Sequence, residues 1–99
     1  MLKKNKIEVI VVLDNIRSMH NIGSIFRTCD AIGNCAIHLC GICAQPPNKE
    51  IYKTALGASE TVQWQYFKTT ESSLENLKKN NFKIIAVEQT KNSMTLSNL

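Results

Sequence analysis

The sequence lacks the features that mark membrane and exported proteins. No apolar run approaches the roughly 18 residues that a membrane-spanning helix requires. The basic N-terminus is followed only by a short apolar run, Val9 to Leu13, which ends at Asp14. That run indicates a buried strand and not a signal peptide. We therefore expect a cytoplasmic protein with no membrane partner.

Glycine is also scarce, and no glycine-rich loop follows the first predicted strand. The chain has 4 glycines, and they do not form the G-x-G-x-x-G pattern that binds dinucleotide phosphates. A dinucleotide-binding loop of that kind is excluded at that position. Internal repeats, low-complexity tracts and linkers are missing too, so we interpret residues 1–99 as a single domain.

Metal ligands are few and irregularly spaced. Cys40 and Cys43 form a C-x-x-C pair, a spacing found in zinc and redox sites. The other candidate ligands are Cys29, Cys35, His20 and His38. They do not repeat the spacing, so we expect no metal. We interpret the cysteines as core residues, because free cysteine packs as a small hydrophobe; zinc binding and redox chemistry are the alternatives.

The charge of the chain is mildly basic. The net charge is +4 and the sequence pI is about 9.0. Such a balance is compatible with a polyanionic partner such as nucleic acid. The lysines are not gathered into one run, so charge alone does not assign the partner.

Apolar periodicity predicts strands that alternate with helices. Strands are expected at Ile7 to Leu13, Ala36 to Cys40, Thr61 to Phe67 and Lys83 to Val87. Helices are expected at Asn21 to Gly33, at Glu50 to Leu56, and from a cap at Thr69 or Thr70 to about Lys79. The order β-α-β-α-β-α-β predicts an α/β fold with a parallel, Rossmann-like sheet and right-handed crossovers.

Several side-chain positions follow from this assignment. The first strand is a nearly continuous β-branched run, typical of a strand buried on both faces of a sheet. The strand at Thr61 to Phe67 alternates polar and apolar residues, as strands near a sheet edge do. This alternation favours core packing of Trp64 and Tyr66 over base stacking. In the last helix, Leu74 and Leu77 are expected to face inward. His38 is expected to be structural.

The helix at 21–33 carries the strongest functional pattern. Asn21 is a suitable N-cap residue and Gly33 a suitable C′ residue. Arg27 lies off the apolar stripe, one turn beyond Gly23, and we expect open space beside its guanidinium. Together with the N–H groups of a helix N-terminus, this predicts an anion site suited to phosphate. The alternative is an ordinary amphipathic helix in which Arg27 pairs with Asp30.

Two motifs lie on and after this helix. The first has the form N-x-G-x-[IV]-x-R-[TS]-A and is matched by Asn21, Gly23, Ile25, Arg27 and Thr28. Cys29 stands where alanine is usual. The second, Lys53 to Glu60, is similar to S-x-G-A-x-E. With the strand order, these motifs resemble the SpoU (TrmH-like) RNA ribose methyltransferases of the SPOUT superfamily, from Ile7 to about Gln89.

The resemblance implies an activity, a cofactor and a partner. Members of the family transfer a methyl group from S-adenosyl-L-methionine to a ribose 2′-hydroxyl in tRNA or rRNA. They are usually homodimers and hold the cofactor in a C-terminal trefoil knot. Carried over, Arg27 is the catalytic arginine that engages the ribose and its phosphate, with Asn21 beside it. Because a guanidinium stays protonated, we expect it to fork onto the phosphate and orient the nucleotide.

The resemblance and the positions of these residues suggest further contacts. The candidate RNA contacts are Arg17, Gly23, Ser24, Thr28 and Lys53, with Lys49 as a further phosphate candidate. The candidate cofactor contacts are Glu88 and Gln89, at the end of the fourth strand.

The chain departs from the family pattern at its C-terminal end. The second and third family motifs do not follow the fourth strand, so the chain resembles the N-terminal part of an α/β-knot domain with the knot missing. Most of the cofactor site is then absent, and we expect the 99-residue chain to be inactive alone. The alternative function is a non-catalytic RNA-binding or dimerisation module.

Overall fold

The central element of the sheet is strand β1 (Val9–Asp14), in which Ile10 to Leu13 are buried and alternate between the two faces. The computed structural model describes residues 6–89 and 94–96. Strands β2 (Cys35–Cys40) and β4 (Lys83–Gln89) flank β1 in parallel. Strand β3 (Trp64–Phe67) pairs in parallel with β2 at one edge, and β5 (Met94–Leu96) pairs antiparallel with β4 at the other. The sheet order is β3-β2-β1-β4-β5.

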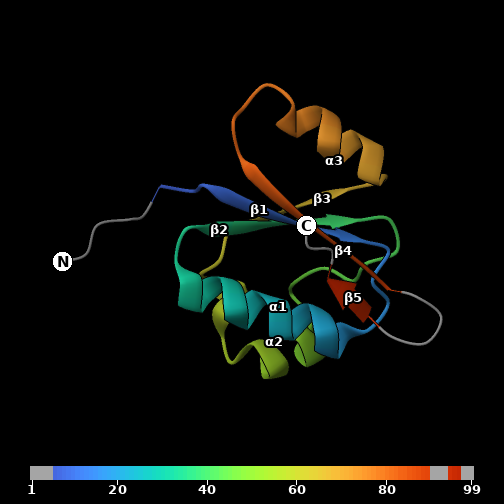
Figure 1. The fold of residues 1–99 in the computed structure, drawn as a ribbon. Coiled ribbons are helices and arrows are strands. Elements are labelled where there is room, and N and C mark those ends of the chain that lie inside the picture. The colour runs from blue at the N-terminus through green and yellow to red at the C-terminus, as the bar shows by residue number, and fades with distance from the viewer. Residues whose placement is uncertain (1–5, 90–93, 97–99) are drawn as a thin grey trace.

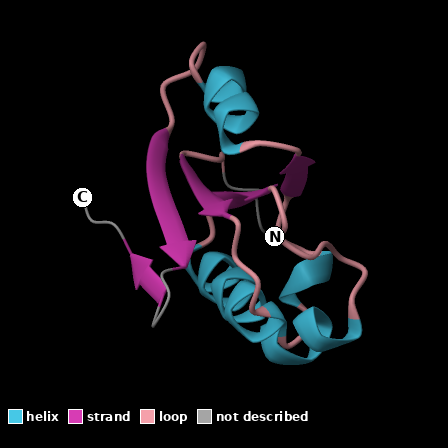
Figure 2. Cartoon of the chain, turned by 90° about the vertical axis from the view of Figure 1, so that its right-hand side faces the viewer, coloured by secondary structure: helices cyan, strands magenta, loops and turns pink. Residues whose placement is uncertain are grey.

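Helices cover both faces of this sheet, as Figures 1 and 2 show. Helices α1 (Met19–Ile32) and α2 (Lys49–Ala55) and the 3₁₀ turn η1 (Ala58–Glu60) lie together on one face. Helix α3 (Thr70–Leu77) lies on the opposite face. The larger core cluster, which includes Phe26, Ile37 and Ile51, fills the space beneath α1 and α2.

Four parallel strands separated by helices confirm the predicted α/β fold and the predicted alternation of strands and helices along the chain. The edge position of β3 is confirmed as well. Strand β5 was not predicted, because residues 88–99 are mostly polar and the strand is defined by backbone pairing with β4. In the described part of the chain, no helix is long and apolar enough to cross a membrane.

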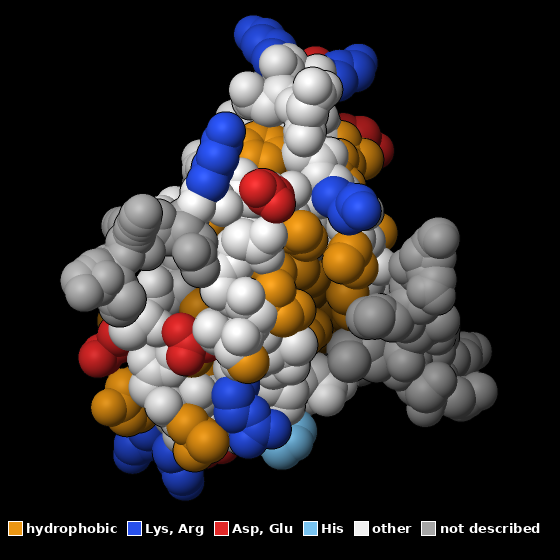
Figure 3. Space-filling view, turned by 60° about the vertical axis from the view of Figure 1, so that its left-hand side comes forward, with side chains coloured by type: hydrophobic (Ala, Val, Ile, Leu, Met, Phe, Trp, Pro, Cys, Tyr) orange, Lys and Arg blue, Asp and Glu red, His pale blue; other side chains and the backbone are white. Residues whose placement is uncertain are grey.

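Basic side chains are spread across the surface. On the face drawn in Figure 3, Lys and Arg lie at both ends of the molecule, with a band of apolar side chains between them. This distribution agrees with the scattered lysines of the sequence. A specific arrangement of a few groups, and not a dense basic patch, must therefore carry any recognition of a polyanion on this face.

The N-cap of the first helix lies three residues earlier than predicted. Ser18 is the N-cap, and its hydroxyl accepts a hydrogen bond of 3.1 Å from the backbone N–H of Asn21. The prediction that Asn21 caps the helix is therefore wrong; Asn21 lies within the first turn. The predicted end is confirmed, since Gly33 has φ 95° and its N–H donates to the carbonyl of Cys29.

The inward face of α3 is partly different from the prediction. Leu77 is buried as expected, but Leu74 is 41% exposed, so the expectation for Leu74 is wrong. The buried residue beside it is Ser73, whose hydroxyl is 2.8 Å from Nδ1 of His38. This hydrogen bond satisfies a buried polar ring, which confirms the structural role of His38 and explains why a serine occupies a core position.

All four cysteines are buried and free, which confirms their role as core residues. The thiol of Cys43 donates to the carbonyl of Leu13 (3.4 Å) and accepts from the N–H of Ile16 (3.2 Å). Burial, with the neighbouring Cys35, raises the pKa of the Cys29 thiol to about 12. Within the described residues, no cluster of three or more His, Cys, Asp or Glu forms a metal site.

The buried histidine makes stability depend on pH. Burial lowers the pKa of His38 from its ordinary value of 6.5, so the unfolded chain binds a proton more readily than the folded one. Its contribution to stability is complete above the unfolded pKa and is lost as pH falls below it. We expect the free energy of unfolding, measured with urea, to fall from about pH 7.5 to about pH 5, and to fall less in His38→Gln.

His20 provides the matched control, since it is the second histidine of the sequence and is exposed. His20→Gln should show the pH dependence of the parent protein. Equal pH dependence in His38→Gln and the parent would mean that protonation of His38 does not oppose folding.

Candidate functional site

The loop between β1 and α1 is held by a polar network at the carboxyl ends of the strands. Asn15 has a positive φ of 53°, a conformation that asparagine tolerates better than most residues. Its Oδ1 accepts from the N–H of Ile42 (3.0 Å), and its Nδ2 donates to Asp14 (2.9 Å). The side chain of Asn15 therefore connects the loop before α1 to the loop after β2 by a hydrogen bond.

Two further hydrogen bonds complete this network. The hydroxyl of Thr70 donates to Oδ1 of Asp14 (2.8 Å), which ties the first residue of α3 to the end of β1. The hydroxyl of Tyr66 donates to the carbonyl of Gly41 (2.6 Å). The half-buried Tyr66 and Trp64 pack against the core, as predicted. Sequence analysis did not single out Asn15, whose only indication was an asparagine directly after a strand.

Arg27 projects from α1 into solvent. Its side chain is exposed, and among the described residues no ion pair or hydrogen bond occupies the guanidinium. The alternative pairing with Asp30 is not found among the described residues, where the ion pair is Lys78–Glu75. Oδ1 of Asp30 accepts from the hydroxyl of Thr61 (3.1 Å). Arg27 is thus held on a regular helix with its charge available to a ligand.

Gly23 lies one turn before Arg27 and is buried against α2. A Cβ built there would overlap Oγ1 of Thr54 and lie 2.9 Å from the carbonyl oxygen of Ile51. The prediction of open space at Gly23 is therefore wrong, since α2 fills that space. The motif glycine permits a close approach of two helices.

The other predicted RNA contacts are spread over the loop and both helices. Arg17 is exposed in the loop before α1, and Lys53 is exposed on α2. The hydroxyl of Thr28 donates to the backbone carbonyl of Ser24 (3.0 Å), one turn earlier on α1. The two cationic side chains therefore come from the loop before α1 and from α2, which packs against α1 at Gly23.

The predicted cofactor residues lie at the carboxyl end of β4. Glu88 is exposed and lies in register with Asp14, and Gln89 pairs through its backbone register with Met94. The end of β4 is thus beside the loop that leads to α1. Ligands of open α/β sheets bind at this edge, where the strands end.

The family model described as the SpoU rRNA Methylase family matches residues 8–99. The chain belongs to this family. It is 28% identical over 97 residues to a tRNA (guanosine(18)-2′-O)-methyltransferase of Aquifex aeolicus. That match covers 95% of the chain and 44% of the relative, so the chain spans less than half of that protein.

Solved structures share the fold of this SpoU-family chain. The SpoU methyltransferase AviRb from Streptomyces viridochromogenes, in complex with AdoMet, gives a TM-score of 0.77 at 13% identity, over 90% of this chain and 43% of that one. An RNA 2′-O ribose methyltransferase gives 0.73 at 14% identity, over 96% and 44%. The described residues therefore have the SpoU architecture around β1.

The contact between α1 and α2 can be tested at the SpoU motif glycine. In an ordinary helix, Gly→Ala is favourable by about 1 kcal/mol. Here the added methyl group meets Thr54 and the carbonyl of Ile51, so we expect Gly23→Ala to destabilise the fold by about 1–3 kcal/mol in urea unfolding. Adding Thr54→Ala should recover part of that loss.

Ser24→Ala is the matched control, because it changes the next residue of the same helix without the steric overlap. It should stay within about 0.5 kcal/mol of the parent. A Gly23→Ala protein as stable as the parent would show that α2 can move away from α1 at little cost.

Proposed function

We propose that this SpoU-family chain is part of an RNA 2′-O-methyltransferase and binds the nucleotide whose ribose is methylated in tRNA or rRNA. The observation that carries the proposal is the exposed guanidinium of Arg27, on a helix that matches the family motif. The Aquifex relative, named as a tRNA 2′-O-methyltransferase, supports the reaction class. The resemblance to the family also leads us to expect a homodimer for the whole enzyme.

The chemistry needs a methyl donor. S-adenosyl-L-methionine supplies a methyl group on a sulfonium, and the AdoMet complex of a SpoU structure supports this choice. Glu88 presents an exposed carboxylate at the carboxyl end of β4, in register with Asp14. Carboxylates suit the hydroxyl and ammonium groups of such a molecule. Glu88, with Gln89 after it, would border the cofactor.

Arg27 has three tasks in this proposal. Its forked donors bind a phosphate of the RNA in two parallel hydrogen bonds. That contact orients the adjacent ribose and so reduces the entropy lost on reaching the reactive geometry. The fixed positive charge also stabilises negative charge that develops on the 2′-oxygen. Since the guanidinium stays protonated, a phosphate oxygen is the better acceptor for the hydroxyl proton.

The remaining polar residues position the RNA. Asn21, in the first turn of α1, offers a carboxamide that can hydrogen-bond to the ribose. Arg17 and Lys53 contact backbone phosphates. Ser24 and Thr28 lie on α1, the helix that carries Asn21. Phosphate contacts of this kind fix orientation and affinity but do not select the sequence.

The test is methyl transfer from tritiated S-adenosyl-L-methionine to unmodified tRNA and rRNA, catalysed by the full-length protein of the same gene. Arg27→Ala and Arg27→Lys should each reduce kcat by about 100-fold or more, because a transition-state contact is lost. Asn21→Ala should reduce activity less. Lys78→Ala is the control, since Lys78 is exposed and pairs only with the exposed Glu75 (3.5 Å) among described residues.

Calorimetric titration of S-adenosyl-L-methionine separates this function from its alternative. A methyltransferase binds the cofactor in its full-length form. A protein that binds RNA with a steep salt dependence, but neither binds the cofactor nor transfers a methyl group, would be a non-catalytic RNA-binding module.

A further inference from the structure

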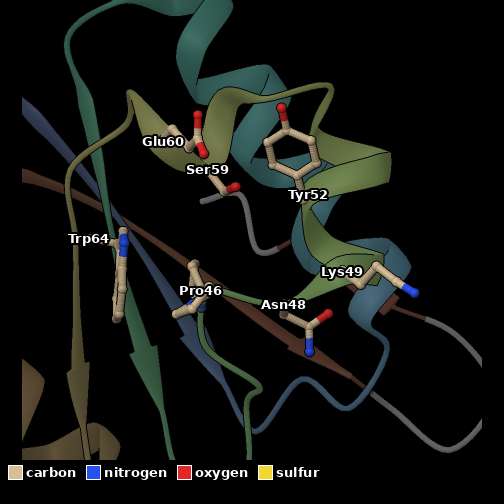
Figure 4. Close-up of a pocket in the computed structure, with 8 residues that line it drawn as sticks. Pro46, Asn48, Lys49, Tyr52, Ser59, Glu60 and Trp64 are labelled. Carbon is tan, nitrogen blue, oxygen red and sulfur yellow. The ribbon is translucent and has the colours of Figure 1, made fainter.

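A cavity of about 520 Å³ borders α2, η1 and β3. Its lining residues are Pro46, Pro47, Asn48, Lys49, Tyr52, Ser59, Glu60 and Trp64. Figure 4 shows the rings of Trp64 and Tyr52 on opposite sides of the cavity, with Pro46 between them. The volume lies within the range of about 300–1,000 Å³ that is usual for small-molecule sites.

The cavity lies on the side of α2 that is turned away from α1. Thr54 faces Gly23 of α1. Tyr52 precedes Thr54 by two residues, which brings it to the opposite side of the helix. The outer surface of α2, where Lys49 and Lys53 are exposed, therefore lies between the cavity and α1.

The walls of the cavity suit a flat aromatic ligand. Tyr52 is 49% exposed although it is aromatic, and Trp64 is half-buried against the core. Pro46 and Pro47 add apolar surface to the lining. Unpaired RNA bases bind by stacking on such side chains, and each base brings a phosphate that a nearby lysine can contact. Lys49 supplies that cation at the rim.

Polar groups at the rim can bond to the edge of a base. Oδ1 of Asn48 accepts from the N–H of Ile51 (3.0 Å), which leaves Nδ2 as its donor group. Glu60 presents a carboxylate acceptor, and both residues line the cavity. One donor and one acceptor match the mixed hydrogen-bonding edge of a nucleobase.

The cavity is also linked to the helix that carries Arg27. Thr61, directly after Glu60, donates to Asp30, which lies one turn beyond Arg27 on α1. An RNA strand bound at Arg27 can thus continue across α2, along its exposed lysines, toward Tyr52. A proline-rich peptide would also suit aromatic walls, but the exposed lysines on α2 and the net charge of +4 favour a polyanion.

We propose that this cavity binds an unpaired nucleobase of the substrate RNA, a few nucleotides from the ribose held at Arg27. The proposal rests on the proposed function, because that function supplies the RNA. It adds a second point of recognition, at a single-stranded position a few nucleotides from the methylated nucleotide.

The test uses the full-length protein and oligouridine of about 12 nucleotides that contains 4-thiouridine. Ultraviolet crosslinking followed by mass spectrometry should place adducts on Tyr52 or Trp64. Fluorescence anisotropy with labelled RNA should show that Tyr52→Ala weakens binding about 5- to 150-fold, the fold-change that corresponds to the loss of one base stack. Tyr52→Phe should bind as the parent does, because it keeps the ring.

Two further variants sharpen the test. Lys49→Gln should weaken binding and reduce the slope of log affinity against log salt by about 1. Leu74→Ala is the control, since Leu74 is an exposed apolar residue on α3, at the opposite face of the sheet. Its RNA affinity should not change.

The outcomes distinguish this inference from the proposed function. Arg27-dependent methyl transfer, with no crosslink at the cavity and unchanged affinity in Tyr52→Ala, would overturn the inference and leave the function in place. Crosslinks at Tyr52 with Tyr52-dependent affinity, but no methyl transfer, would support the cavity and overturn the enzyme. A proline-rich peptide that binds through Tyr52 without competition from RNA would overturn the inference.

Discussion

The double-sided burial of β1 is the constraint on which the fold depends. A strand that is apolar on both faces must have a layer of helices above and below the sheet. Leu13 and Val11 contact the core beneath α1 and α2, and Ile10 and Val12 contact the cluster that includes Leu77 of α3. The same strand ends at Asp14, where the polar network begins. The core and the candidate site therefore share one element.

The elements of this fold could be predicted because their sequences follow simple periods. β-branched runs indicated the parallel strands, and the spacing of Ile22, Phe26 and Cys29 indicated α1. The start of α1 was not predicted correctly, because Ser18 and Asn21 are both good cap residues and lie within one turn of each other. The path of the backbone in the folded protein determines which of the two caps the helix, and there it is Ser18. The short β5 has no such pattern, since its pairing depends on β4.

The environment of the site was harder to predict than its residues. Arg27 and Gly23 stood out by motif, but a motif does not say what packs against a glycine. Thr54, about thirty residues further along the chain, occupies that space, so the glycine acts through helix packing. Likewise, the cavity joins Pro46, Tyr52 and Trp64 from three segments. Such neighbours result from tertiary structure and leave no local pattern.

The four buried thiols can report local opening of the fold, because each must become exposed before a reagent can reach it. A thiol reagent reacts with the thiolate, and burial holds the pKa of the Cys29 thiol at about 12. Cys29 lies between α1 and the sheet, whereas Cys40 belongs to the cluster on the α3 side. The alkylation rate of each cysteine therefore measures how often its own layer separates from the sheet, without any engineered probe.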